Sequence, residues 1–236
     1  MTVSRRTLLG FALLPLACDS AKPHQGFLGL TERLNDRVQR GLFRPGKLAR
    51  EEPESALTAE GEFPLYKVGD DYPDLPERWR LRVHGLVGKP LELSLADLKR
   101  LPAAQFRVRH HCVEGWSAVA SFHGVRVSEI ARLCRADPRA RFVEFRSFER
   151  GQPSEDAPPV PYYSSWDRES AEHPQTILAY GRNGAGMSLE EGAPLRLYSA
   201  VKLGYKMVKW VDEVIFQPVR TGGYWEDLGY EWFAGV

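Results

Sequence analysis

Hydrophobic and polar residues alternate along several short stretches of this chain, and such a period of two is typical of half-buried β-strands. Turn formers at residues 85–90 follow the first of these stretches and mark the end of a strand. The same reasoning extends to two apolar stretches near the C-terminus. The expected strands are residues 79–83, 105–111, 141–146, 194–199 and 211–217.

Helical periodicity is confined to short stretches. Residues 31–39 can form an amphipathic helix. A second helix is expected over residues 94–98, because Ser94 can cap it and Asp97, three residues later, can complete a capping box. Residues 127–134 fit a third helix with Ser128 as its cap.

Proline and glycine mark two connections. Residues 153–161 are rich in proline and predict a loop, and the glycines of 181–186 predict a turn. Many short strands with short helices between them favour an α+β fold over repeated βαβ units. With 236 residues and no second-domain linker, we expect one α+β domain with mixed sheets over residues 63–236. A loosely ordered N-terminal extension, residues 23–62, is expected to precede it.

The first residues have the pattern of an export signal. Arg5 and Arg6 stand before an apolar run at residues 8–17, which is half the roughly 20 residues that a membrane-spanning helix needs. The arginine pair favours a twin-arginine signal peptide over residues 1–22, with a chance match as the alternative. Leu16-Ala17-Cys18 also resembles a lipoprotein processing site. We therefore expect a periplasmic or exported protein, either soluble or lipid-anchored through Cys18.

Composition and charge exclude several classes of protein. The chain is 43% hydrophobic and carries a formal net charge of +1, which argues against a disordered chain and against a dedicated nucleic-acid binder. Three cysteines are too few for a disulfide-stapled scaffold. No nucleic-acid partner is expected.

Familiar catalytic signatures are missing from the sequence. It contains no HExxH, GxSxG or Walker motif and no paired CxxC. His110 and His111 are adjacent, so on a strand their side chains would point to opposite faces. A metal site built on two histidines is therefore not expected.

One segment concentrates reactive side chains. Cys112 ends an expected strand and follows Arg109, His110 and His111. Cationic neighbours would favour the thiolate, which binds soft metals or attacks electrophiles. From the residues alone an inert buried cysteine is the commonest outcome, and a disulfide with Cys134, a metal ligand and a nucleophile stay open.

Motifs spread over most of the chain resemble one family. The segment Cys112-Val113-Glu114-Gly115-Trp116-Ser117 resembles the molybdenum-ligand segment of the sulfite oxidase family of molybdopterin enzymes. The similarity extends from about Phe63 to Gly235 and is strongest to bacterial exported members, among them periplasmic methionine sulfoxide reductases. Further motifs in family order are Leu178-Ala179-Tyr180, Asn183-Gly184, 192–197, Gly204-Tyr205-Lys206, Lys209-Trp210 and 223–227.

The resemblance implies both a cofactor and a reaction. A pterin dithiolene would hold molybdenum, and Cys112 would be the only protein ligand to the metal. The implied activity is oxygen-atom transfer with sulfite or a sulfoxide, and the cofactor would carry the redox chemistry. Electrons would pass to or from a separate haem protein, for which a membrane-bound one is a candidate. The chain ends at Val236 without the dimerisation domain of sulfite oxidases, so we expect a monomer.

The resemblance also assigns roles to individual residues. Tyr163, or its neighbour Tyr162, falls where sulfite oxidases carry an active-site tyrosine that can hydrogen-bond the substrate or gate proton transfer. The chain departs from the reductase pattern at Phe63 and Glu191, where asparagines are expected; a glutamate lacks the amide donor, and its charge would repel a phosphate. The implied cofactor-binding residues are Tyr66, Lys67, Cys112, Ser147, Arg196, Lys206, Met207, Val208 and Lys209.

The substrate and two other classes of function stay open at this stage. Gly115-Trp116-Ser117 is neutral where animal and plant sulfite oxidases have an arginine pair, although Arg109 or His110 could supply charge. A sulfoxide is therefore as credible a substrate as sulfite. The alternatives are a cofactor-free family member that acts as a binding or scaffold protein, and a metal-free thiol enzyme with Cys112 as nucleophile and His110 or His111 as base.

Overall fold

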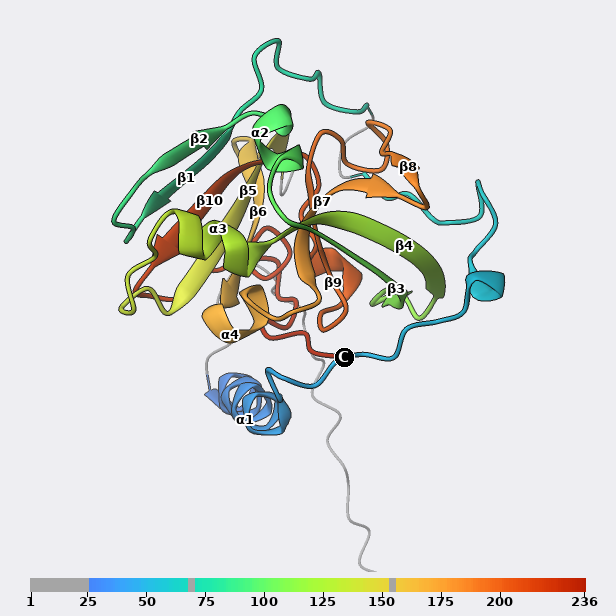
Figure 1. Cartoon of the computed structure of the whole chain (residues 1–236). Coiled ribbons are helices and arrows are strands. Elements are labelled where there is room, and N and C mark those ends of the chain that lie inside the picture. The colour runs from blue at the N-terminus through green and yellow to red at the C-terminus, as the bar shows by residue number, and fades with distance from the viewer. Residues whose placement is uncertain (1–25, 68–70, 153–155) are drawn as a thin grey trace, which may run out of the picture.

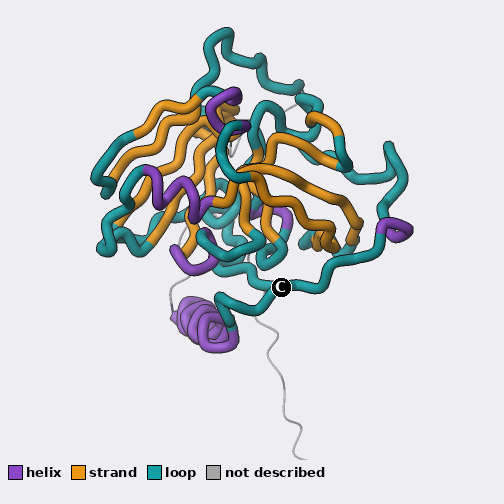
Figure 2. Tube along the Cα trace, in the orientation of Figure 1, coloured by secondary structure: helices purple, strands orange, loops and turns teal. Residues whose placement is uncertain are grey.

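Two β-sheets lying side by side organise the chain, with short helices at their edges (Figures 1 and 2). The computed structural model describes residues 26–67, 71–152 and 156–236. The expected α+β fold with mixed sheets is confirmed. The expected signal peptide, Cys18 and the first residues of the proline-rich loop lie outside the described residues.

The first sheet is mixed and has the strand order β2-β1-β10-β5-β6. Strands β1 and β10 run parallel, and each of the other neighbouring pairs is antiparallel. The parallel pair joins residues about 130 positions apart, such as Arg82 and Glu213. The strands are β1 (Leu81–Gly85), β2 (Leu91–Leu93), β5 (Phe142–Gly151), β6 (Val160–Asp167) and β10 (Val211–Gln217).

The second sheet is antiparallel, with β4 between β3 and β7 and with β8 and β9 both paired to β7. Its buried face is aromatic: the rings of Phe122 and Tyr198 stack with centroids 3.8 Å apart. The strands are β3 (Ala103–His111), β4 (Ser117–Arg126), β7 (Thr176–Arg182), β8 (Ala185–Gly186) and β9 (Arg196–Ser199).

The helices are short except for the first. Helix α3 follows β4 directly, and Ile130 in α3 packs in the main core with residues of both sheets. Helix α1 lies apart from both sheets, at the bottom of the molecule in Figure 1. The helices are α1 (Gly26–Leu42), α2 (Leu95–Lys99), α3 (Val127–Leu133) and α4 (Arg168–Ala171), with 3-10 turns at Glu54–Ala56 and Gly204–Lys206.

The two predicted helix caps have different outcomes. Ser94 caps α2, and the reciprocal bonds with Asp97 complete the capping box, as predicted. The prediction for Ser128 was wrong, because the N-cap of α3 is Arg126, whose side chain makes no capping bond. Strand β4 runs directly into α3, so β4 fixes the start of the helix by its own pairing with β7.

The alternating pattern located strands better than it located their ends. Strand β10 has the predicted bounds, and β1 begins two residues later than expected. The turn expected at 181–186 is the connection of the β7–β8 hairpin. Strands β4 and β7 were not predicted, because nearly all their residues are buried and neither strand alternates.

The segment after α1 is attached to the domain by hydrogen bonds along its length. The N–H groups of Glu52 and Thr58 donate to carbonyls of β3 and β4 at 2.9 and 3.0 Å. The N–H of Ala49 donates to the Gln175 side chain at 2.8 Å. The N-terminal extension therefore leads from α1 to the edge of the second sheet. Across residues 26–67, 71–152 and 156–236, no helix has both the length and the apolar character needed to cross a membrane.

Candidate active site

A cavity of about 130 Å³, open to solvent, lies where six segments of the chain meet. These are residues 63–67, the end of β3 with the turn into β4, the end of β5, the start of β6, the start of β9, and the segment from the second 3-10 turn to Tyr230. The cavity, called the pocket below, is lined by Phe63, Pro64, Leu65, Tyr66, Lys67, His110, Cys112, Val113, Glu114, Trp116, Glu149, Tyr162, Arg196, Gly204, Tyr205, Met207, Lys209, Trp210, Trp225 and Tyr230.

Cys112 lies in the tight turn that joins β3 to β4. The Cys112 N–H donates to the Trp116 carbonyl at 3.0 Å, and the Gly115 N–H donates to the Cys112 carbonyl at 3.2 Å. Gly115 has φ of +88°, a backbone conformation that residues other than glycine rarely adopt. The turn therefore holds Cys112 at the edge of the sheet with its side chain at the pocket.

The sequence predicted that cationic neighbours favour the Cys112 thiolate, but the surroundings of Cys112 favour the neutral thiol. Burial raises the pKa of the thiol, and the nearby Glu114 carboxylate adds to this rise. The Sγ atom lies 3.8 Å from Glu114 Oε2. Arg109 instead points away to Glu52, at 3.3 Å. The expected cationic stabilisation was therefore wrong, because alternation along β3 sends Arg109 to the opposite face.

The second cysteine is separate from this site. Cys134 is fully buried at the end of α3, and its Sγ lies 3.4 Å from the carbonyl oxygen of Ala131. Both cysteines are free. The disulfide left open at the sequence level does not form.

His110 faces the pocket as a neutral imidazole. Burial, with Arg196 and His111 as further causes, lowers the His110 pKa to about 3. Its ring packs against Phe63, with centroids 5.5 Å apart. A Cβ on Gly204 would lie 2.6 Å from Nε2 of His110, so this ring position requires glycine there. His110 therefore supplies no positive charge to the pocket.

Arg196 brings a buried guanidinium to the pocket wall. Its Nη1 donates to the Glu191 carbonyl at 2.9 Å, and its Nε has no partner among the described residues. Burial lowers the Arg196 pKa to about 10. The Glu191 carboxylate pairs with Arg182 and accepts from the Ser188 N–H at 2.7 Å. The departure from the family pattern at Glu191 thus places a neutralised carboxylate outside the pocket lining.

Two further titratable groups face the pocket, and the first of them was missed from the sequence. Burial raises the Glu149 pKa to about 7, against the opposing effect of Lys209, and Glu149 Oε2 has no partner among the described residues. Burial and Arg196 lower the Lys209 pKa to about 7, and its Nζ donates to the Glu190 carbonyl at 2.8 Å. Glu149 and Ser147 are alternate residues on the buried face of β5. An acidic residue at a buried position of a strand was the signal available in the sequence.

Some of the residues implied by the family resemblance lie outside the pocket lining. Ser147 is buried, and its Oγ accepts from the Glu149 N–H at 2.9 Å. Lys206 is fully buried and pairs with Glu226, while its Nζ donates to the Ser165 carbonyl at 3.0 Å. Val208 is fully buried in the main core. The residues that do line the pocket are Tyr66, Lys67, Cys112, Arg196, Met207 and Lys209.

The two candidate tyrosines separate clearly. Tyr162 lines the pocket, donates its hydroxyl to the Tyr205 carbonyl at 3.1 Å and accepts from Trp225 Nε1 at 2.8 Å. Tyr163 is outside the lining, and its hydroxyl donates to Asp227. Successive residues of β6 point to opposite faces, so only one of the pair can reach the pocket.

The pocket fits a polar, partly anionic group. Within the part of the chain that the structure describes, three residues that line it each have a buried polar atom without a partner: His110 Nδ1, Glu149 Oε2 and Arg196 Nε. Buried polar atoms are normally hydrogen-bonded, so these three have bonding capacity that a group bound in the pocket could use. The described residues contain no group of three or more His, Cys, Asp or Glu that could hold a metal. A metal at Cys112 would therefore take most of its ligands from a cofactor.

Comparison with known sequences identifies the family. Residues 69–225 match the family described as the oxidoreductase molybdopterin binding domain. The chain belongs to this family. The resemblance predicted from the Cys112 segment is confirmed, and with it the class of enzyme, a molybdopterin-dependent oxidoreductase.

Two relatives are informative. A putative protein-methionine-sulfoxide reductase subunit, YedZ1, of Azospira oryzae is 35% identical over 97% of this chain and 84% of its own length. The protein-methionine-sulfoxide reductase catalytic subunit MsrP of Campylobacter jejuni is 30% identical over 68% of this chain and 57% of its own length. The match to this catalytic subunit thus spans little more than half of that relative.

A solved structure supports the fold. The sulfane dehydrogenase SoxCD from Paracoccus pantotrophus matches with a TM-score of 0.54 and 21% identity, over 63% of this chain and 40% of that one. At this identity the similarity concerns the fold alone. It agrees with a sulfite-oxidase-type molybdopterin domain.

Proposed function

We propose that this protein reduces sulfoxides by oxygen-atom transfer at a molybdenum–molybdopterin centre held by Cys112. The observation that carries the proposal is the position of Cys112 at a pocket whose buried Arg196, Glu149 and His110 each have a polar atom without a partner among the described residues. The family and the names of the relatives, which refer to methionine sulfoxide reductases, support the same chemistry.

Four side chains would hold the cofactor. Cys112 would bind the metal as the thiolate, and since its pKa is raised, binding would release the thiol proton. Arg196 and Lys209 are the cations suited to the phosphate, and Lys67 lies at the same pocket. When bound, the cofactor supplies a metal that accepts the oxygen atom and stores two electrons.

Sulfoxide reduction also needs protons. The reaction takes up two electrons and two protons, breaks the S–O bond, and releases a thioether and water. Glu149 is placed to deliver protons, because its pKa of about 7 allows both protonation states near neutral pH. The titratable groups that interact with it are Lys209, Tyr162 and Tyr224.

Tyr162 is the tyrosine that we assign to the substrate side. The sequence favoured Tyr163, but Tyr163 lies outside the pocket lining, whereas Tyr162 is part of it. Burial raises the pKa of Tyr162, so its phenol remains protonated and can only donate or accept a hydrogen bond. To position an oxygen atom of the substrate, the Tyr162 hydroxyl would exchange its bond to the Tyr205 carbonyl for one to that oxygen atom.

The pocket lining favours a neutral substrate over sulfite. Aromatic side chains surround the opening, and Tyr66 is 54% exposed there. With Arg196, Lys209 and Lys67 assigned to the cofactor, the carboxylates of Glu114 and Glu149 would be left to face the substrate, and like charges repel an anion. A sulfoxide carries no net charge, and its apolar groups can contact the rings.

Export and an electron partner complete the proposal. The Arg5-Arg6 pair and the apolar run after it support transport to the periplasm, and Leu16-Ala17-Cys18 supports lipid attachment at Cys18. Electrons would come from a separate haem protein.

A molybdenum-to-protein ratio, measured by plasma mass spectrometry after expression in a host that makes the cofactor, tests this function. We expect a ratio near one for the unchanged chain and near zero for Cys112→Ser, with Cys134→Ala as the matched control. Loaded protein should reduce methionine sulfoxide with a reduced dye and should oxidise sulfite poorly. Equal ratios for the unchanged chain and Cys112→Ser would refute the metal assignment, and a ratio near zero in folded protein would favour the scaffold alternative.

A further inference from the structure

Helix α1 is amphipathic, but its apolar side faces away from the protein. Leu30, Leu34, Val38 and Leu42 recur every four residues and so share one side of the helix. Their exposed fractions are 57%, 59%, 49% and 73%. We call these four residues the outer stripe. A helix on a globular protein normally turns such a stripe toward the core.

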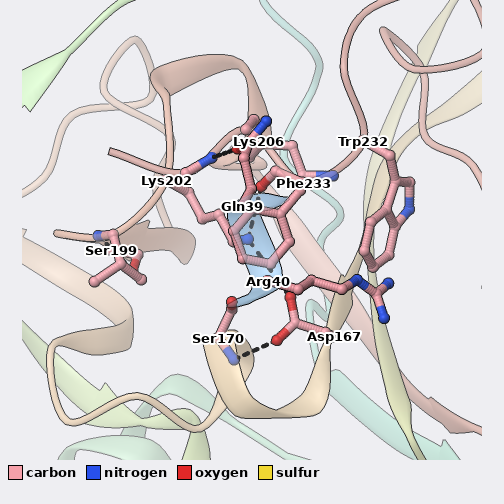
Figure 3. Close-up of polar contacts among 12 residues, drawn as sticks. Gln39, Arg40, Asp167, Ser170, Ser199, Lys202, Lys206, Trp232 and Phe233 are labelled. Atoms are coloured by element: carbon pink, nitrogen blue, oxygen red, sulfur yellow. Dashed lines mark hydrogen bonds and ion pairs between the residues drawn. The ribbon is translucent and has the colours of Figure 1, made fainter. Parts of the chain in front are cut away.

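The side of α1 that faces the protein is polar. Asp36 and Glu32 pair with Arg220, with N–O distances of 3.4 and 3.9 Å. Gln39 Oε1 accepts the Gly235 N–H at 3.1 Å. Figure 3 shows Gln39 and Arg40 reaching from α1 to the C-terminal segment, where the Arg40 guanidinium lies 5.2 Å from the Trp232 ring centre. These bonds fix the rotation of α1 and hold the outer stripe outward.

Charge is segregated on the helix in the same direction. Both acids of α1, Glu32 and Asp36, are turned toward Arg220. Arg33 and Arg37, by contrast, are exposed and flank the outer stripe. An apolar stripe bordered by arginines is the pattern of a helix that lies in the interface of an anionic bilayer.

The position of α1 in the chain indicates the same surface. Cys18 precedes Gly26 by eight residues (26 − 18 = 8), and the apolar run 8–17 comes just before it. Eight residues span at most about 29 Å. A chain attached to a membrane through either feature would therefore keep α1 near the lipid surface.

We propose that α1 is a membrane-surface helix, which inserts the outer stripe into the interface of an anionic bilayer and contacts the lipid headgroups through Arg33 and Arg37. A second copy of the chain and an apolar protein partner are the competing occupants of the stripe. The proposal is independent of the proposed chemistry, because α1 contributes no residue to the pocket.

Vesicle sedimentation of the full chain tests the proposal, with Cys18→Ser in every sample to remove any lipid attached there. We expect this parent to bind vesicles of phosphatidylcholine mixed with phosphatidylglycerol. Leu34→Glu with Val38→Glu should weaken the binding by about tenfold or more. Arg33→Ser with Arg37→Ser should weaken binding by about twentyfold on the mixed vesicles and little on phosphatidylcholine alone.

The matched control is Leu75→Glu. Leu75 is 53% exposed, and segment 71–80 lies at the end of the molecule away from α1 (Figure 1). This variant should bind like the parent. All variants should keep the molybdenum content and sulfoxide activity of the parent, so failure of the proposed function would be seen separately. Absent vesicle binding by the parent, or equal binding by the Leu34 and Val38 variant, overturns the proposal. A parent that is a dimer in solution and becomes a monomer in that variant would assign the stripe to a second copy.

Discussion

Two regions of the molecule each bury two cations, the pocket and the packing around residues 226–233. The two regions differ in whether the cations are paired with carboxylates. Around residues 226–233, Lys202 Nζ donates to the Phe233 carbonyl at 2.6 Å and lies 3.5 Å from Asp167, and Lys206 pairs with Glu226 (Figure 3). We call these four side chains the lysine cluster: Lys202, Lys206, Asp167 and Glu226.

Among the described residues, neither pocket cation forms an ion pair with a carboxylate within 4 Å. Arg196 donates only to a carbonyl, and Lys209 donates to a carbonyl beside the Trp210 ring. Burial of a charge is costly unless it is paired. In the lysine cluster each cation pairs with a carboxylate of the fold, whereas in the pocket a bound anion would supply the pairing. A buried cation that is paired within the fold is thus structural, and one without such a pair is suited to bind a ligand. Lys206 belongs to the first kind because it pairs with Glu226, although the family resemblance implied a cofactor contact.

The largest expected effect is in the lysine cluster. Lys206→Met removes one partner of a buried ion pair and leaves Glu226 charged, which should lower the free energy of unfolding by about 3–5 kcal/mol. Denaturant unfolding of the cofactor-free protein measures this. Adding Glu226→Gln should recover part of the loss, and the exposed Lys89→Met should change stability by less than about 0.5 kcal/mol. Unchanged stability with lost molybdenum would restore Lys206 to the cofactor site.

The next effect concerns Glu149. Glu149→Gln should lower kcat for sulfoxide reduction by about 100-fold, because the amide cannot deliver a proton. The unchanged enzyme should lose kcat as pH rises above about 7, where Glu149 ionises, and the variant should lack this decline. Steady-state kinetics across pH with a reduced dye measures both. An unaltered pH profile in the variant would exclude Glu149 as the proton donor.

The same residue predicts a stability trend with a defined sign. Folding raises the Glu149 pKa from 4.5 to about 7, so the folded protein binds more protons between these values. Its contribution to stability is therefore present below about pH 4.5 and is lost as pH rises through 7. Thermal unfolding of cofactor-free protein should show Glu149→Gln gaining stability relative to the unchanged chain at pH 8. The exposed Glu77→Gln should show no such gain.

Arg196 should affect loading more than folding. Arg196→Met replaces a buried, incompletely paired charge by an apolar side chain, so the cofactor-free protein should unfold at the same or a higher temperature. The molybdenum-to-protein ratio should fall by about tenfold, since the anion loses its guanidinium partner. Arg182→Met, which removes the partner of Glu191, should instead lower the unfolding temperature. The comparison would fail if both variants behaved alike.

The smallest expected effect separates the two tyrosines. Tyr162→Phe removes the proposed hydrogen bond to the substrate, worth about 1 kcal/mol, so kcat should fall by about fivefold. Tyr163→Phe should leave kcat unchanged, because its hydroxyl bonds Asp227 outside the pocket. Dye-linked assays of both variants with methionine sulfoxide give the ratio. A larger loss in Tyr163→Phe would return the role to that residue.

The sequence predicted those parts of the fold that depend on interactions between neighbouring residues. The capping box of α2 and the strand β10 follow from neighbouring residues, and both were predictable from the sequence. Strands β4 and β7 were not, because burial on both faces removes the alternation that identifies a strand. The inward-facing polar side of α1 could not be predicted either, since it depends on Arg220, far away in the chain.

At the site, motif order located Cys112 and Arg196 but could not orient their neighbours. Tyr162 and Tyr163 are adjacent, and only the register of β6 decides which one lines the pocket. Glu149 was missed because no family motif points to it, although the alternation of buried and exposed residues places it on the buried face of β5. Lys206 was assigned by position, but its ion pair with Glu226 exists only in the folded protein.

The parallel pairing of β1 with β10 has a consequence for how the protein acquires its cofactor. Residues 82–85 pair with residues 213–216, and the pocket draws on the chain from Phe63 to Tyr230. A nascent chain still emerging from the ribosome therefore has neither the central pair of its first sheet nor a complete pocket. Pairings this distant in sequence also form slowly, because a long loop must close first. A ligand that uses the whole pocket can accordingly bind only after synthesis has passed residue 230.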